Sequence, residues 1–414
     1  MSSTKQPPHE AKAEVSTTHL RLILLGARRI PSLHRKYLSS LDDAQQPLAL
    51  DSLPVLTPLE LSVATDELLR DRRPDDGSLI YAGGGTLTRP SMSLLPKDMF
   101  VEEVHGSWAA LGPGDVLANF FPAGRTWPTH SFYNQLAARA GASALPVGDL
   151  QDGQFERWLG FCAEYGVNAL AAPPDIVDRL LRHRAAGHQL PWLRKLLIGG
   201  AFHDPTPQGE IARWLPGVEV WQLYGSAEAW MVGHRGPGCA EGVFHPLPHQ
   251  YAEIDGGRIL VTTTGVHRAP PLIRYLIGDL GAPAACACGR EGSPIRVLGR
   301  IAPSVVYQGR PIRARELVDL ALETGEVTAA QVAVVTTEGA DETAQTVELR
   351  VVLADGVPDD HYTREWIRYQ ALNGHLALDP TKAEHAEGFQ VVVVDRLHGD
   401  GSEEPPVLVV ESAG

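Results

Sequence analysis

The sequence predicts an α/β protein with a large layered N-terminal domain and a small α+β C-terminal domain. Short apolar segments alternate with helical periods between residues 78 and 223, which is typical of a mainly parallel sheet covered by helices. After about Arg300 the pattern changes to paired strands with helices between them. The length of 414 residues, 43% of them hydrophobic, allows two or three domains with sizeable cores.

The individual elements follow from local apolar patterns. In the first domain, strands are expected near residues 78–81, 115–121, 144–147, 169–171, 196–198 and 218–223, and helices near 131–140 and 155–165. In the second domain, helices are expected at 316–322 and 361–373, and strands at 331–336, 347–353 and 389–395. The chain therefore divides into a disordered polar tail over 1–17, an N-terminal domain over 18–300 and a C-terminal domain over 301–414.

Composition and charge exclude several classes of protein. The net charge of −14 repels a phosphate backbone, so nucleic acid is not an expected partner. Four cysteines in so long a chain do not form a secreted disulfide framework. The first apolar run, Leu22 to Leu25, is too short for a signal peptide core or a membrane span. We therefore expect a cytoplasmic protein with no membrane partner.

The first candidate site is a run of glycines after the strand that contains Tyr81. Gly83, Gly84 and Gly85 would let backbone N–H groups approach a phosphate, and Thr86 would add a hydroxyl. The alternative is a tight turn that requires positive φ angles.

The second candidate site is the turn from Tyr224 to Glu228, which offers an aromatic ring, small residues and one carboxylate. A carboxylate beside a triphosphate is a natural Mg²⁺ ligand, whereas the alternative is a surface glutamate after a turn. The third candidate is Asp279 with Arg300. Asp279 would accept hydrogen bonds from both ribose hydroxyls and Arg300 would donate to the sugar or a phosphate, unless Asp279 is an ordinary turn residue.

In this order and spacing, the sites resemble the phenylacetate–CoA ligase branch of the adenylate-forming enzyme superfamily. The resemblance covers nearly the whole chain. The matching segments are 53–58, Gly114-Asp115-Val116 with Asn119, 172–174, Tyr224-Gly225-x-x-Glu228, Arg274-Tyr275-x-x-Gly278-Asp279-Leu280, Cys286-x-Cys288-Gly289-Arg290 and Gly299-Arg300.

The resemblance implies an enzyme that joins a carboxylic acid to ATP as an acyl-adenylate and passes the acyl group to a thiol or an amine. The implied small molecules are ATP or AMP, Mg²⁺ held by Glu228, and CoA or carrier-protein phosphopantetheine. An aromatic-rich stretch suits an aryl acid, and the divergence of the motifs suggests specialised biosynthesis. A homodimer is common among relatives and stays open here.

The resemblance also assigns roles to residues. The implied catalytic residues are Glu228, Thr86 and His130. The implied nucleotide-binding residues are Gly84, Gly85, Thr86, Gly200, Ala201, Tyr224, Gly225, Ser226, Asp279 and Arg300, with Tyr224 near the adenine. The implied acid pocket consists of Phe120, Phe121, Trp127, His130, Tyr133 and Gly199, although the aromatic residues could equally be core.

Cysteine and histidine residues near the last two sites suggest a structural zinc. Cys239, His245, Cys286 and Cys288 supply three thiolates and one imidazole, which is a sufficient tetrahedral shell. His249 is the alternative fourth ligand, and the competing interpretation is a set of free buried thiols. Cys162 is expected in the core of a helix.

Three segments depart from the family pattern. Gly83 to Pro90 has lost hydroxyl donors that the family's phosphate loop contains, and Pro303 follows Arg300 where the hinge normally carries acidic residues. The tail over 397–407 is acidic and has no lysine, although the family places a catalytic lysine there. Lys382 and Arg396 are the nearest cations in sequence.

Three functions therefore remain open at the level of sequence. The chain could adenylate an acid slowly or with a relocated cation. It could instead transfer an acyl group from a preformed activated donor to an amine or carrier. The third alternative is a catalytically silent binding protein, which the retention of Tyr224, Glu228, Asp279 and Arg300 argues against.

Overall fold

The computed structural model describes most of the two expected domains. The described residues are 15–42, 49–71, 77–85, 90–124, 126–150, 153–199, 208–265, 269–290, 292–301, 304–307, 310–338, 343–375, 378, 388–399 and 407–413. Several predictions therefore lie outside the described residues. These are the tail over 1–14, Thr86, Gly200, Ala201, the hinge positions 302–303, Lys382 and the acidic segment 400–406.

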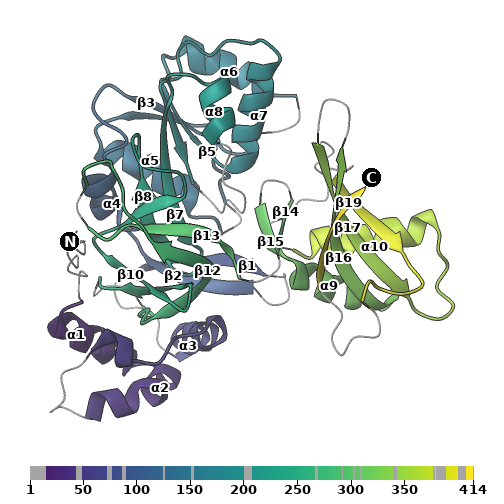
Figure 1. Ribbon diagram of the computed structural model, residues 1–414, viewed down its shortest axis with the longest axis horizontal. Coiled ribbons are helices and arrows are strands. Elements are labelled where there is room, and N and C mark those ends of the chain that lie inside the picture. Colours follow the sequence, from purple (N-terminus) through teal and green to yellow (C-terminus); the bar gives the residue numbers. More distant parts are fainter. Residues whose placement is uncertain are drawn as a thin grey trace, which may run out of the picture.

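The chain begins with helices that cover one end of the large sheet. They are α1 (Thr17–Ala27), α2 (Pro31–Asp42) and α3 (Pro58–Asp71), preceded by the short 3-10 helix η1 (Leu50–Ser52) before α3. Ser16 caps α1, since its side chain accepts a hydrogen bond from the backbone N–H of His19. Leu20, Leu24 and Tyr37 pack in one core cluster with residues of the sheet, which attaches these helices to its antiparallel half (Figure 1).

An 11-stranded sheet forms the centre of the N-terminal domain, in the order β10-β11-β12-β13-β9-β8-β7-β6-β5-β3-β4. Its parallel part consists of β3 (Val116–Asn119), β4 (Ser143–Pro146), β5 (Ala169–Ala172), β6 (Lys195–Ile198) and β7 (Glu219–Ser226). Its antiparallel part continues from β7 through β8 (Trp230–Arg235), β9 (Val243–Pro246), β10 (Gln250–Asp255), β11 (Arg258–Thr263), β12 (Tyr275–Pro283) and β13 (Ile295–Arg300).

The sheet is therefore mixed, and the expectation of a mainly parallel sheet was wrong. That expectation came from the part of the chain that ends at β7, where strands and helices do alternate. Beyond β7 the described chain returns in successive antiparallel strands with no helix before residue 300. Strand β8 is buried at all six positions, so its sequence shows no alternation that would reveal its direction or pairing.

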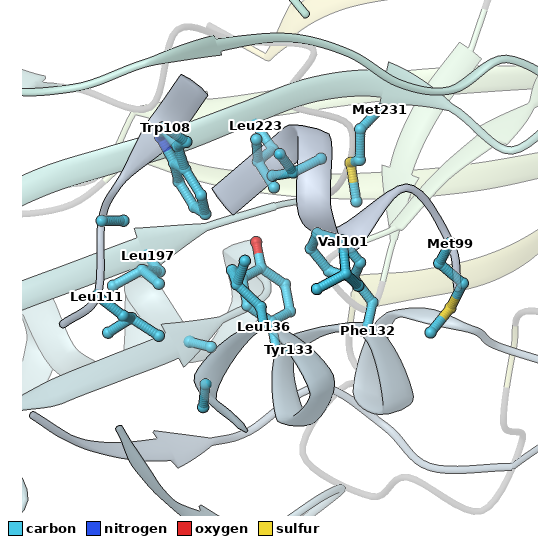
Figure 2. Close-up of a cluster of buried hydrophobic side chains, with 14 of the residues drawn as sticks. Met99, Val101, Trp108, Leu111, Phe132, Tyr133, Leu136, Leu197, Leu223 and Met231 are labelled. Atoms are coloured by element: carbon cyan, nitrogen blue, oxygen red, sulfur yellow. The ribbon is translucent and has the colours of Figure 1, made fainter. Parts of the chain in front are cut away.

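Helices cover both faces of the parallel part. Leu196 and Ile198 of β6 face a cluster with α6 (Phe155–Glu164), α7 (Pro174–Ala185) and α8 (Gln208–Trp214), whereas Leu197 faces α4 (Val101–Trp108) and α5 (Thr129–Arg139). This alternation follows from the two-residue period of a strand. Figure 2 shows the second cluster, in which Phe132, Tyr133 and Leu136 of α5 meet Leu197 and Leu223 of the sheet.

The C-terminal domain is a small α+β unit, as the sequence predicted. A hairpin of β14 (Ser304–Tyr307) and β15 (Arg310–Arg313) leads into a four-stranded sheet in the order β18-β17-β16-β19. The strands of this sheet are β16 (Val327–Glu338), β17 (Thr343–Leu353), β18 (Phe389–Val393) and β19 (Leu408–Ala413), and the helices are α9 (Ala314–Leu322) and α10 (His361–Asn373). Both helices share one core with the sheet, and the domain stands beside the larger one in Figure 1.

A separate hairpin, β1 (Ser78–Gly85) and β2 (Pro90–Pro96), carries the glycine run. Within the described part of the chain, no helix combines the length and the apolar character that crossing a membrane requires.

Candidate functional site

A buried hydrogen-bonded centre joins three residues that the sequence predicted to act together. The Tyr224 hydroxyl donates to Asp279 Oδ2 over 2.6 Å, and Arg300 Nε lies 3.0 Å from Asp279 Oδ1. Asp279 and Arg300 are directly paired across β12 and β13, so the sheet register fixes their approach. We call Tyr224, Asp279 and Arg300 the ribose-side centre.

Burial is the largest influence on the pKa values of Asp279 and Tyr224 in this centre. It raises the pKa of Asp279, while Arg300 and the hydrogen bond from Tyr224 lower it and Glu228 adds to the rise. Burial and the negative charge of Asp279 raise the pKa of Tyr224 well above its ordinary value. Tyr224 therefore stays a neutral donor to Asp279. Its ring, expected near an adenine, lies tilted against Phe244 with 5.3 Å between the ring centroids.

The turn that follows β7 begins with two residues that fix its shape. A Cβ atom on Gly225 would lie 1.8 Å from the Trp230 carbonyl oxygen, so only glycine fits there. Ser226 Oγ accepts a hydrogen bond of 3.0 Å from the backbone N–H of Ala229. Both predicted nucleotide-binding residues therefore shape the turn that ends in Glu228.

The glycine hairpin packs directly on this turn. The Tyr81 hydroxyl donates to the Ala227 carbonyl, and a Cβ atom on Gly83 would lie 2.3 Å from the Ala227 Cβ atom. The structure thus brings the predicted phosphate loop and the predicted Mg²⁺-binding turn together. Gly84 and Gly85 end β1, and Gly85 pairs with Pro90 after a bulge. Only the base of this loop lies in the described chain.

Part of the predicted acid pocket also forms one group. The rings of Phe121 and Tyr133 stack with centroids 4.6 Å apart, and a Cβ atom on Gly199 would lie 2.6 Å from the Tyr133 hydroxyl. The Tyr133 hydroxyl is buried and has no hydrogen-bond partner. His130 Nδ1 lies 2.7 Å from the Phe121 carbonyl oxygen, so the neutral ring donates from Nδ1 and keeps Nε2 for another partner. Figure 2 shows the Tyr133 oxygen directed into the apolar cluster.

One other residue of the predicted pocket lies apart from this group. Phe120 points to the opposite face of the sheet from Phe121 and packs with Leu159 and Leu170. Adjacent residues at the end of a strand face opposite sides, which sequence proximity does not reveal. Trp127 lies half-buried before α5, and its backbone N–H donates to the Gly124 carbonyl oxygen.

The four predicted zinc ligands converge. The Cys239, Cys286 and Cys288 sulfur atoms and a ring nitrogen of His245 all lie within 4.8 Å of one another, and Cys288 Sγ is 3.2 Å from His245 Nε2. Burial opposes ionisation of Cys286, but hydrogen bonds from the Cys288 backbone and His245 lower its pKa to about 6. His245 Nδ1 is buried without a hydrogen-bond partner. This set of donors fits a tetrahedral metal ion.

The alternatives to this set are less favourable. His249 lies outside the cluster and stacks on Phe100 with 4.2 Å between centroids. Cys162 is fully buried in α6, and burial raises its pKa to about 12, as expected of a core thiol.

One charged residue near the site was missed. Arg313, at the end of β15, places Nη2 3.9 Å from Glu228 Oε1 across the domain boundary. One signal for Arg313 was available in the sequence: it lies only 13 positions after Arg300, a member of the ribose-side centre. Sequence spacing gave no measure of the distance to Glu228.

Comparisons with known proteins agree with this geometry. The family described as AMP-binding enzyme matches residues 4–262. Phenylacetate-coenzyme A ligase of Thermus thermophilus is 26% identical over 376 residues, which are 81% of this chain and 80% of that protein.

Two solved structures show the same fold. 2-Hydroxyisobutyryl-CoA ligase, in complex with 2-HIB-AMP and CoA in the thioesterification state, has a TM-score of 0.75 at 16% identity, covering 99% of this chain and 94% of its own. Amide bond synthetase McbA from Marinactinospora thermotolerans has a TM-score of 0.59 at 17% identity, covering 95% and 82%.

The matching family model and the shared fold together place the chain in the adenylate-forming class of ligase-type enzymes. The chain belongs to the AMP-binding enzyme family, in its phenylacetate–CoA ligase-like branch.

Proposed function

We propose that the protein activates a carboxylic acid, with an aryl acid as the first candidate, by joining it to ATP as an acyl-adenylate. The acyl group then passes to a thiol, such as CoA or a carrier-protein phosphopantetheine, or to an amine. The nearness of the Gly83 hairpin, the turn that carries Glu228 and the ribose-side centre supports this proposal, since a nucleotide would need groups for its phosphates, its metal ion and its ribose close together.

Each described group has a role in this proposal. Asp279 and Arg300 bind the ribose, and Glu228 holds Mg²⁺, which would offset charge on the phosphates. Glu228 fits such an ion because its carboxylate oxygens are the donors that Mg²⁺ prefers. Phe121 and Tyr133 line the acid pocket. The unpartnered Tyr133 hydroxyl favours an acid with a polar group on its ring, because an unsatisfied buried hydroxyl costs about 1–3 kcal/mol.

ATP–pyrophosphate exchange with Mg²⁺ tests the first step. We expect exchange that depends on an added aryl acid, and hydroxylated aryl acids to give faster exchange than their unsubstituted parents. A Tyr133→Phe variant should lose that preference while keeping exchange with the parent acid. Folded protein that exchanges with no acid in a panel of aryl and short acyl acids would contradict the adenylation step.

A second candidate function is acyl transfer from a preformed activated donor. The absence of lysine from 397–407 favours it, since the family uses a lysine there as the adenylate forms. Under this alternative, a supplied acyl-adenylate would be consumed with an amine or thiol while pyrophosphate exchange stayed at background. If neither reaction proceeds, a silent binding protein is the remaining interpretation.

The domain arrangement bears on the second step. The TM-score of 0.75 with 2-hydroxyisobutyryl-CoA ligase in the thioesterification state falls to 0.58 for the same enzyme in the postadenylation state. This difference supports the proposal that the arrangement described here is the acyl-transferring one.

We also propose that Cys239, His245, Cys286 and Cys288 hold a structural zinc ion. The ion would tie the loop after β8 to the loop after β12, and β12 carries Asp279. Metal analysis of purified protein should give about one zinc per chain, as for a closed site with four protein ligands. Cys288→Ser should lose that zinc and lower the thermal midpoint, whereas Cys162→Ser should retain the zinc.

A further inference from the structure

Arg313 lies where the C-terminal domain meets the turn that carries Glu228. It ends β15 and immediately precedes helix α9. Its guanidinium extends between two carboxylates, with Nη2 3.9 Å from Glu228 Oε1 and Nη1 4.0 Å from Glu316 Oε1. One of these carboxylates belongs to each domain, so Arg313 is a cation that the small domain brings to the proposed nucleotide site.

The small-domain side of this contact is held firmly. Glu316 Oε2 lies 3.1 Å from Nε2 of His375, which is buried at the end of α10. Burial opposes ionisation of Glu316, but the hydrogen bond from His375 and the charge of Arg313 lower its pKa below the ordinary value. A carboxylate held by His375 therefore lies 4.0 Å from Arg313 on the side of the small domain.

The contacts of Arg313 itself are loose on both sides, at 3.9 Å from Glu228 and 4.0 Å from Glu316. Both separations exceed hydrogen-bond range, and the Arg313 side chain is 53% exposed. Ion pairs of this kind contribute little to stability. A guanidinium makes stronger, forked hydrogen bonds with phosphate oxygens. A phosphate that arrived beside Glu228 would therefore be a better partner for Arg313 than Glu228 is.

The carboxylates of Glu228 and Asp279 would make a nearby cation favourable when a phosphate binds. Asp279 is paired with Arg300; burial raises the pKa of Asp279, and the nearby negative charge of Glu228 adds to that rise. A polyphosphate would add further negative charge beside these two carboxylates. The family's lysine, which would offset that charge, has no counterpart in 397–407.

We propose that Arg313 contacts a phosphate group of the bound nucleotide and supplies a cation from the C-terminal domain. This proposal rests on the proposed nucleotide site and extends it, since it assigns Arg313 to binding a phosphate and not the nucleoside. The small domain would then contribute to nucleotide binding through the β14–β15 hairpin and not through its tail.

Isothermal titration calorimetry of the full-length protein tests this, with adenosine and ATP as separate ligands and Mg²⁺ present. Arg313→Ala should weaken ATP binding about tenfold, the effect of losing one charge-assisted hydrogen bond, and change adenosine binding less than twofold. Arg313→Lys should give an intermediate loss, because lysine keeps the charge but not the fork. Arg315→Ala, two residues further along in α9, is the matched control, since Arg315 pairs with Asp319.

The outcomes separate this inference from the function on which it rests. Arg313→Ala protein that binds ATP as tightly as the wild type would overturn the inference while leaving the nucleotide site in place. Equal weakening of adenosine and ATP would also overturn it, because it would indicate a structural role in domain docking. Wild-type protein that binds neither ligand would overturn both proposals.

Discussion

The ribose-side centre and the contact between Arg313 and Glu228, which we call the domain junction, differ in how tightly they hold their charges. At the centre, Tyr224, Asp279 and Arg300 are linked at 2.6 and 3.0 Å inside one sheet. At the junction, Arg313 stands 3.9 Å from Glu228, and the two residues belong to different domains. The first region is buried within the sheet, whereas the Arg313 side chain of the second is 53% exposed. The difference shows that charges are held tightly inside the sheet and loosely where the two domains meet.

The largest expected effect comes from breaking the turn beside the centre. Gly225→Val would drive a side chain into the Trp230 carbonyl, so we expect the free energy of unfolding to fall by about 3 kcal/mol or more. Urea unfolding followed by circular dichroism measures this. Gly160→Ala, on helix α6 with no atom within 4 Å of the added Cβ, should be neutral or stabilising. Equal stability of the two variants would show that the turn is not rigid.

Removing the charge of Asp279 should come next. Asp279→Asn leaves Arg300 without its counter-charge and offers the ribose one acceptor in place of a carboxylate. We expect adenosine binding to weaken about 10- to 100-fold, the effect of a charge-assisted hydrogen bond. Calorimetry with adenosine measures it, and Asp319→Asn, at an exposed ion pair, is the control. Unchanged binding would place the nucleoside elsewhere.

A smaller effect is expected for Glu316, which lies near Arg313 in the small domain. Glu316→Gln removes the charge that faces buried His375, so the free energy of unfolding should fall by about 1–3 kcal/mol at pH 7. Because the pKa of Glu316 is lowered in the folded protein, its contribution is present above its ordinary value of 4.5 and disappears as the pH falls below it.

The difference between wild type and Glu316→Gln in urea unfolding should therefore be constant from pH 7 to about pH 5 and shrink as the pH falls below 4.5. Glu323→Gln, an exposed position at the end of the same helix, should show little difference over the same range. A Glu316→Gln effect that grew on acidification would contradict the assignment of that carboxylate as ionised.

The smallest expected effect is on the loose pair itself. Glu228→Gln should change the free energy of unfolding by no more than about 0.5 kcal/mol, since an ion pair at 3.9 Å with a half-exposed arginine contributes little. The same variant should reduce the Mg²⁺ dependence of ATP binding. A large loss of stability would mean that the domain junction is as tight as the ribose-side centre, which would contradict the difference described between the two regions.

Sequence reasoning predicted the parts of the molecule that depend on local pattern. Strands such as β5 and β18 and helices α9 and α10 fall where apolar periods placed them. Asp279 and Glu228 were singled out because each follows a glycine in its motif; Glu228 does follow the end of β7, whereas Asp279 lies in the middle of β12 and not at a strand end.

Features that depend on distant parts of the chain were not predictable in this way. The close approach of Gly83 to Ala227 requires two segments that lie far apart in sequence to pack together. The direction of β8 was hidden because all its residues are buried. Arg313 was missed because its partner Glu228 lies in another domain, and no spacing rule connects them.

The weakness of the Arg313–Glu228 contact bears on how firmly the two domains are held against each other. An ion pair of about 1 kcal/mol or less changes the ratio of two conformations by no more than about fivefold. This contact alone therefore does not fix the small domain against the large one. Under the proposed function, a ligand that binds one domain arrangement more tightly than another would shift the population toward it in proportion to that preference.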